Sequence, residues 1–185
     1  MSPLHSILST VVNVLNENKI AHVLIGGLVV NHYGYARNTT DVDFMMVVPD
    51  TNKIVSIMKN AGFTSYSVQP MVMYFQNPND PVRIDFLRID PDTLDKIIQS
   101  AESVDISGTS VKIPSLPNLL AMKLHSFGQS PVRGKDFEDI VWLCIFNNVD
   151  MEEVLHPLAV KYASEAVYQQ VRDRIDHEKP RLIDF

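Results

Sequence analysis

Two aspartates at the start of an apolar strand constrain this chain more than any other feature of its sequence. Asp41 and Asp43 alternate with Val42 and Phe44, and the apolar run continues to residue 48. Successive side chains of a β-strand point to opposite faces, so both carboxylates lie on one face and the apolar residues on the other. Two like charges held this close are unfavourable unless a cation or solvent compensates them. The pattern predicts either a cation site or a solvated strand face.

A second acidic strand and a pair of glycines favour the cation site. Residues 82–87 alternate in the same way, with Asp85 on the face opposite its apolar neighbours. A third carboxylate on an adjacent strand is what a two-metal site needs, because metal ions about 3.5–4 Å apart share ligands. Gly26 and Gly27 end one expected strand and open a helix, which leaves backbone N–H groups accessible to phosphate.

Apolar periodicity, proline starts and turn residues predict the remaining elements. Helices are expected at 3–18, 28–33, 51–61, 91–101, 116–127, 134–147, 151–162 and 164–177, and strands at 20–25, 41–48, 63–68, 71–76, 82–87, 104–106 and 111–113. The turn at 78–81 predicts an antiparallel hairpin. Residues 107–110 predict the loop of a second hairpin.

This order of elements predicts an α/β (α+β) fold with a mixed, mainly antiparallel sheet flanked by helices. Strands end near residue 113, and only helices are expected beyond that point. We therefore expect a catalytic α/β domain over residues 1–114. A helical segment over residues 115–185 is expected to complete the cleft of that domain.

Composition excludes several classes of protein. The longest apolar run, residues 23–30, falls well short of the roughly 20 residues that cross a bilayer. The first residues lack the pattern of a secretory signal, so we expect no membrane span and a cytoplasmic location. Cys144 is the only cysteine, which excludes an intrachain disulfide and a multi-cysteine metal site. A net charge of −6 argues against broad binding to nucleic-acid phosphates.

The glycine pair and the aspartates together resemble the signature of the DNA polymerase β-like nucleotidyltransferase superfamily. Residues 25–27 read Ile-Gly-Gly, and thirteen residues separate them from the Asp-Val-Asp-Phe of residues 41–44. Residues 35–41, 120–124 and 133–140 resemble segments of the abortive-infection-type toxins and related minimal bacterial nucleotidyltransferases. The resemblance covers about residues 20–146 and matches nothing in the last forty residues.

The resemblance implies a role for the three aspartates and for the glycine pair. Asp41, Asp43 and Asp85 would be the catalytic carboxylates and the ligands of Mg²⁺ (or Mn²⁺), and Gly26 and Gly27 would bind the nucleotide. The reaction would move a nucleoside monophosphate from a nucleoside triphosphate to an acceptor hydroxyl and release pyrophosphate. Asp85 would lie nearest the acceptor oxygen and assist its deprotonation.

Three basic residues are further candidates for nucleotide binding. The resemblance directs Lys123 at the triphosphate; the alternative is a lysine whose stem covers apolar surface. Arg37 precedes the acidic strand and would contact phosphate, unless it is a solvated loop arginine. Lys135 is the third candidate, and its alternative is a surface ion pair with Asp139, four residues further along the helix.

The resemblance leaves the acceptor open. An RNA end is the acceptor of the toxin relatives, and a protein side chain is that of the minimal enzymes paired with a small helical partner. A small molecule such as an aminoglycoside is a third acceptor. An antitoxin or helical partner protein is therefore an expected partner. The alternative function is a catalytically inactive nucleotide-binding or regulatory module of the same fold.

Overall fold

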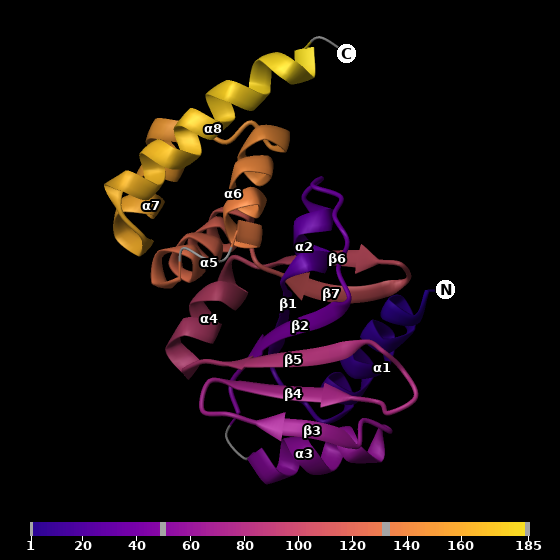
Figure 1. Ribbon diagram of the computed structural model, residues 1–185. Helices are drawn as coiled ribbons and strands as arrows, with labels where there is room; N and C mark the ends of the chain where they lie inside the picture. Colours follow the sequence, from indigo (N-terminus) through magenta and orange to yellow (C-terminus); the bar gives the residue numbers. More distant parts are fainter. Residues whose placement is uncertain (1, 49–50, 131–133, 184–185) are drawn as a thin grey trace. The chain divides into compact units, whose positions relative to one another are not determined.

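The computed structural model describes residues 2–48, 51–130 and 134–183, with side chains through residue 179 (Figure 1). The chain forms two compact units. Residues up to 29 and 37–115 make the first, and residues 30–36 with those from 116 onward make the second. The predicted domain boundary after residue 114, and the role given to the segment beyond it, stay predictions.

The first unit is built on a five-stranded sheet. Its strands lie in the order β1 (His22–Ile25), β2 (Asp41–Met46), β5 (Arg83–Arg88), β4 (Val72–Gln76) and β3 (Ser65–Val68). The β2–β5 pair is parallel, and the other three pairs are antiparallel. The predicted mixed, mainly antiparallel sheet is therefore confirmed, including the hairpin between β4 and β5.

One face of this sheet is the core of the unit. Its fully buried side chains include Val42, Phe44 and Met46 of β2, Ile84 and Phe86 of β5, and Met73 and Phe75 of β4. The Phe86 ring lies 5.9 Å from that of Phe44 and 5.5 Å from that of Phe75. Burial of these apolar side chains holds the register of the strands, because a slip of one residue would turn them to the opposite face.

Helices and a hairpin surround the sheet in the first unit. The helices are α1 (Pro3–Glu17), α3 (Thr51–Asn60) and α4 (Pro91–Gln99), and α1 contacts β2 and α3. The Ser2 hydroxyl caps α1 by accepting from the His5 N–H, with Pro3 at the first helical position.

The hairpin of β6 (Glu102–Ile106) and β7 (Thr109–Ile113) contacts β1 through β7. Its loop is shorter than the predicted four residues. Ile106 pairs with Thr109, so only Ser107 and Gly108 connect the strands. Both have positive φ, 55° and 86°, as a type I′ turn requires.

The second unit is helical. It comprises α5 (Leu116–Gln129), α6 (Gly134–Phe146), the π-helical turn η1 (Met151–Leu155), α7 (His156–Tyr162) and α8 (Glu165–Ile183). The single helix predicted over 151–162 is therefore interrupted. Leu155 donates to the carbonyl five residues earlier, that of Asp150, and Pro157 has no N–H to continue the ordinary helical pattern.

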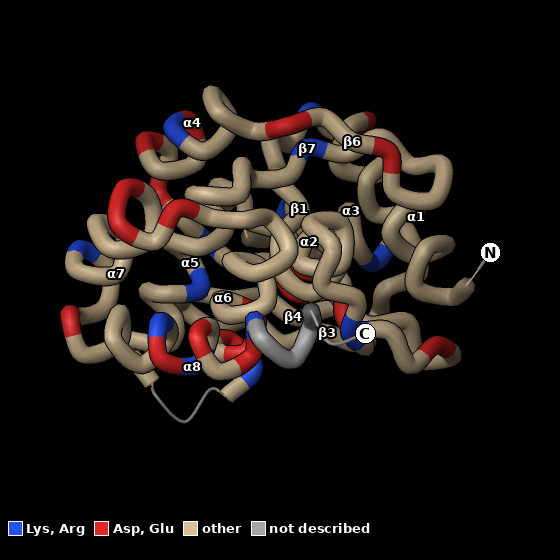
Figure 2. Tube along the Cα trace, turned by 90° about the horizontal axis from the view of Figure 1, so that it is seen from above, with Lys and Arg blue, Asp and Glu red and all other residues tan. Residues whose placement is uncertain are grey.

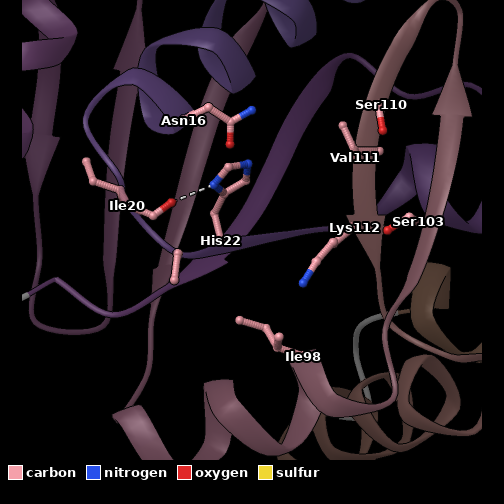
Figure 3. Close-up of a pocket in the computed structure, with 9 residues that line it drawn as sticks. Asn16, Ile20, His22, Ile98, Ser103, Ser110, Val111 and Lys112 are labelled. Atoms are coloured by element: carbon pink, nitrogen blue, oxygen red, sulfur yellow. Dashed lines mark hydrogen bonds between the residues drawn. The ribbon is translucent and has the colours of Figure 1, made fainter.

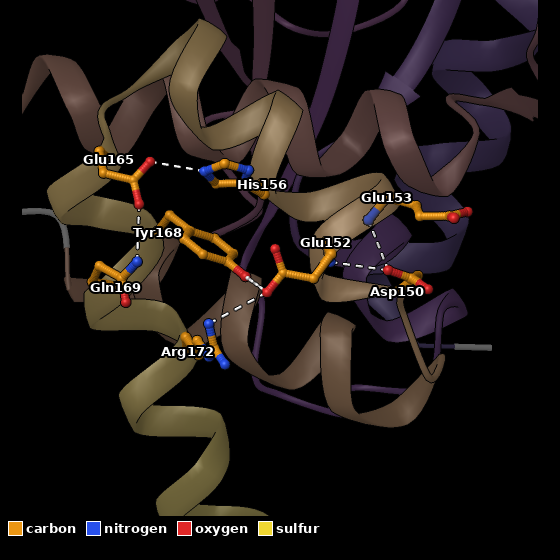
Figure 4. Close-up of polar contacts among 8 residues, drawn as sticks. All are labelled: Asp150, Glu152, Glu153, His156, Glu165, Tyr168, Gln169 and Arg172. Atoms are coloured by element: carbon orange, nitrogen blue, oxygen red, sulfur yellow. Dashed lines mark hydrogen bonds and ion pairs between the residues drawn. The ribbon is translucent and has the colours of Figure 1, made fainter.

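Polar contacts join η1 and α7 to α8 (Figure 4). The Tyr168 hydroxyl donates to Glu152 at 2.9 Å, and Arg172 approaches the same carboxylate at 3.3 Å. His156 Nε2 lies 2.8 Å from Glu165. These contacts order the start of α8 against the turn before it.

The short helix α2 (Gly27–His32) carries the boundary between the units, which falls after Val29. Residues 30–36 belong to the second unit, where Asn147 donates to the Tyr33 carbonyl at 2.9 Å. Acidic and basic residues are mixed along the described part of α8 (Figure 2). Within the described residues, no helix is both long enough and apolar enough to span a bilayer.

Candidate functional site

The parallel pairing of β2 with β5 brings the three predicted aspartates together. Asp43 lies directly opposite Asp85 in the register, and Asp41 lies directly opposite Arg83. Alternation along each strand puts these four side chains on one face, and Val42, Phe44 and Ile84 on the other. Four adjacent positions of two strands therefore carry three acids and one base.

Arg83 pairs with two of these carboxylates. Its Nε donates to Asp85 Oδ1 at 2.6 Å and its Nη2 to Asp85 Oδ2 at 2.8 Å, while Nη2 also lies 3.4 Å from Asp41 Oδ2. Hydrogen bonding to Asp85 raises the pKa of Arg83, so the guanidinium stays charged. Burial raises the pKa of Asp85 above its ordinary value, although the hydrogen bonds from Arg83 act in the opposite direction.

Two residues of this face, Arg83 and Tyr74, were assigned no role from the sequence. Arg83 is two residues from Asp85 on the same strand, so the alternation that placed Asp85 also placed Arg83. Tyr74 lies opposite Asp85 on β4, and its ring centre is 5.0 Å from the Arg83 Cζ. Only the pairing of β4 with β5 reveals the contact between Tyr74 and Arg83.

The glycine turn lies against the same face. Gly26 has φ of +73°, and a Cβ there would overlap the Asp43 carboxylate. A Cβ on Gly27 would overlap Thr39 Oγ1 and lie 3.3 Å from Arg37 Nη1. The structure therefore brings Gly26, Gly27 and Arg37 together near Asp43. Side chains larger than hydrogen at the turn would displace the groups around it.

Lys123 belongs to the second unit and has two carboxylate partners there. Its Nζ lies 2.8 Å from Asp136 Oδ1 and 2.7 Å from Asp139 Oδ2. Asp136 also accepts from the Ser126 hydroxyl at 2.7 Å. The Lys123 side chain is 13% exposed, and Asp139 is fully buried. A contact of Lys123 with nucleotide phosphate stays a prediction.

Lys135 is exposed in the first turn of α6. The alternative interpretation, a surface ion pair with Asp139, is wrong, because Asp139 is fully buried and pairs with Lys123. A nucleotide contact of Lys135 stays a prediction. Arg133, part of the same sequence segment, lies outside the described residues.

The chemistry of the three aspartates fits a hard divalent cation. Mg²⁺ and Mn²⁺ prefer oxygen ligands, and two or three carboxylates from adjacent strands supply them. Among the described residues, however, no three acidic, histidine or cysteine side chains converge as a metal-binding group. Two of the aspartates face Arg83, and the third lies against Gly26. The donor set has the chemistry that the cation needs, and a bound cation at this face stays a prediction.

A separate hollow of about 290 Å³ lies elsewhere in the first unit (Figure 3). Its lining includes His22, Ile98 and Lys112, and none of the predicted site residues. His22 Nδ1 donates to the Ile20 carbonyl at 2.8 Å, and burial lowers the pKa of His22. The register partner of His22 is Met46, on the sheet face away from the aspartates. This hollow is distinct from the carboxylate site.

Comparison with known proteins relates the chain to nucleotidyltransferases. A family model described as "Nucleotidyl transferase of unknown function (DUF2204)" matches residues 4–178. No curated protein sequence matches the chain.

Solved structures share its fold. The antibiotic-resistance factor ANT(2″)-Ia has a TM-score of 0.65 at 14% identity, with 93% of this chain and 96% of that one covered. The lincosamide adenylyltransferase LnuA, bound to lincomycin, has a TM-score of 0.53 at 16% identity, covering 74% and 93%. A nucleotidyltransferase-like protein from Paracoccidioides brasiliensis has a TM-score of 0.53 at 18% identity, covering 96% and 89%. At identities this low, the structural similarity shows a common fold and nothing further.

Proposed function

This chain belongs to the DUF2204 family of nucleotidyl transferases, and we propose that it moves a nucleoside monophosphate from a nucleoside triphosphate to an acceptor hydroxyl, with release of pyrophosphate. One observation carries the proposal. Asp43 and Asp85 are direct partners on parallel strands, with Asp41 on the same face and the Gly26 turn beside them. That arrangement supports two-metal phosphoryl chemistry, in which carboxylates share cations.

Each predicted site residue of the first unit has a role in this proposal. Asp41, Asp43 and Asp85 hold Mg²⁺ or Mn²⁺, which when bound neutralises charge on the phosphates. Gly26 and Gly27 keep their turn free of side chains for the triphosphate, and Arg37 adds a positive charge beside it.

Asp85 is suited to accept the proton of the acceptor hydroxyl. It is shielded from solvent, with 15% of its side chain exposed, and burial raises its pKa. This direction holds for the metal-free site, and a bound cation would lower the pKa of Asp85, so the proton-accepting role rests on the position of Asp85 opposite Asp43.

The acceptor is proposed from a short set of hydroxyls. RNA ends and protein side chains are the first two. With either acceptor, the protein would act as a toxin in the cytoplasm, and an antitoxin or helical partner protein would restrain it. Small molecules are the third, because the structures that share the fold include ANT(2″)-Ia with adenylyl-2″-tobramycin and LnuA with lincomycin. The net charge of −6 disfavours RNA, whose binding relies on many basic contacts.

Label transfer tests the proposal and identifies the acceptor class. Purified protein, Mg²⁺ and each of four labelled nucleoside triphosphates are incubated with total RNA, cell lysate protein or a panel of aminoglycosides and lincosamides. Label in one fraction that Asp43→Asn abolishes supports the proposal. The matched control is Asp92→Asn, which removes an exposed carboxylate of α4 in the same unit.

A binding module is the rival outcome. It predicts magnesium-dependent binding of triphosphate in calorimetry without label in any fraction. Absence of both transfer and triphosphate binding would contradict both functions.

A further inference from the structure

The guanidinium of Arg83 stands between two carboxylates that the proposed function gives to a metal ion. It engages both oxygens of Asp85, at 2.6 and 2.8 Å, and approaches Asp41 at 3.4 Å. A cation shared by these two carboxylates would need the same approach. Two positive charges about 4 Å apart repel each other.

We propose, resting on the function proposed above, that Arg83 is a resident counter-ion that competes with the divalent cation for Asp41 and Asp85. With Arg83 in place, the acidic face is partly neutralised without metal. When a cation binds, Arg83 must leave Asp41 and at least one oxygen of Asp85. Arg83 thus sets the metal concentration at which the site fills.

The position of Arg83 on the surface makes this exchange inexpensive. Its side chain is 46% exposed, so the released charge remains hydrated. Mg²⁺ requires near-octahedral oxygen ligands at about 2.0–2.1 Å, which a carboxylate clamped by a two-pronged guanidinium does not present freely.

The Tyr74 ring could bind the guanidinium of Arg83 after a cation displaces it from the carboxylates. Its ring centre already lies 5.0 Å from the Arg83 Cζ, within the range of a cation–π contact. Tyr74 is also the register partner of Asp85. A small rotation of Arg83 towards the ring would therefore expose the carboxylates while its charge stays stabilised. Arg83 is a positioning residue in this scheme, and Tyr74 assists it.

Titration of Mn²⁺ into the free protein, without nucleotide, tests the exchange by calorimetry and by the electron spin resonance of free Mn²⁺. Arg83→Gln removes the competing charge and is expected to lower the Mn²⁺ Kd about tenfold, which corresponds to about 1.4 kcal/mol. Arg83→Lys keeps a charge but loses the two-pronged contact, so an intermediate Kd is expected. Tyr74→Leu is expected to raise the Kd two- to threefold.

Arg88→Gln is the matched control, because it removes one positive charge from the other end of β5, where Arg88 pairs with Met46. An Mn²⁺ Kd for Arg83→Gln equal to that for Arg88→Gln overturns this inference. The proposed function still stands in that case if the wild type binds Mn²⁺ and Asp43→Asn does not. Binding of Mn²⁺ by Arg83→Gln alone supports the exchange in its strongest form. If neither the wild type nor Arg83→Gln binds Mn²⁺, with or without triphosphate, the metal-dependent function itself fails. Circular dichroism confirms that each variant is folded.

Discussion

Arg83 donates two parallel hydrogen bonds to the carboxylate of Asp85, two residues away on the same strand. The pleat of β5 puts both side chains on the face that also carries Asp41 and Asp43 of β2. This face therefore holds its three acids together with one built-in cation. The balance of charge at these four positions leads to the first of five predictions.

Asp43→Asn is expected to reduce label transfer by about a thousandfold or more. The change keeps the shape of the side chain and removes a metal ligand whose electrostatic contribution amounts to several kcal/mol, and each 1.36 kcal/mol corresponds to a factor of ten in rate. Steady-state transfer rates with saturating Mg²⁺ measure the effect. Wild-type rates in Asp43→Asn would remove Asp43 from the site.

Gly26→Ala is expected to lose transfer activity and to destabilise the protein. An alanine at φ of +73° costs about 1–2 kcal/mol, and its Cβ would also displace the Asp43 carboxylate. Gly108→Ala is the matched control, since Gly108 has φ of +86° but no atom within 4 Å of an added Cβ. Urea unfolding should show a similar backbone cost in both variants and an additional cost in Gly26→Ala. Full activity in Gly26→Ala would contradict the close approach of the turn to Asp43.

Lys123→Met is expected to lower the free energy of unfolding by about 3–5 kcal/mol. It would remove the cation that lies 2.7 Å from the fully buried Asp139 carboxylate, and removing one partner of a buried ion pair is costly. Lys135→Met removes an exposed lysine from the same unit and should change stability by less than about 0.5 kcal/mol. Equal stability of the two variants in denaturant titration would show that the pair of Lys123 with Asp139 contributes nothing.

Acidification should destabilise the protein through His22. Burial lowers the pKa of folded His22 below its ordinary value of 6.5, so the unfolded chain binds this proton first as the pH falls. The stabilisation is complete above about pH 6.5 and is lost as the pH falls through the folded pKa. Melting temperatures from pH 8 to pH 5 should therefore fall less steeply in His22→Asn, which keeps a donor for the Ile20 carbonyl. His177→Asn, at an exposed position on α8, should follow the wild type.

The Cys144 thiol should be inert in the folded protein. Burial raises its pKa to about 12, so almost no thiolate forms at pH 8, and access to the sulfur is blocked. A thiol-reactive dye is expected to label Cys144 only when urea unfolds the protein. Rapid labelling without denaturant would indicate that α6 opens locally.

The sequence predicted most elements because each depends on local chemistry. Apolar alternation located β2 and β5, and Ser2 with Pro3 located the start of α1. Boundaries shifted by a few residues where pairing decided the end of a strand. The loop of the β6–β7 hairpin is shorter than predicted, only Ser107 and Gly108, because Ile106 pairs with Thr109. The helix over 151–162 was interrupted, although Pro157 was visible in the sequence.

By itself, the sequence predicted which residues carry the chemistry, and it determined which face of each strand they occupy. The period of two along a strand is a property of the backbone, so Asp41 and Asp43 share a face in any fold that makes residues 41–46 a strand. Only the tertiary structure decided that β5 lies parallel beside β2, with Asp85 opposite Asp43 and Arg83 opposite Asp41. It also gave Lys123 the partners Asp136 and Asp139, of which Asp139 is fully buried. Strand order and long-range ion pairs depend on packing between segments distant in the chain, and local periodicity carries no information about that packing.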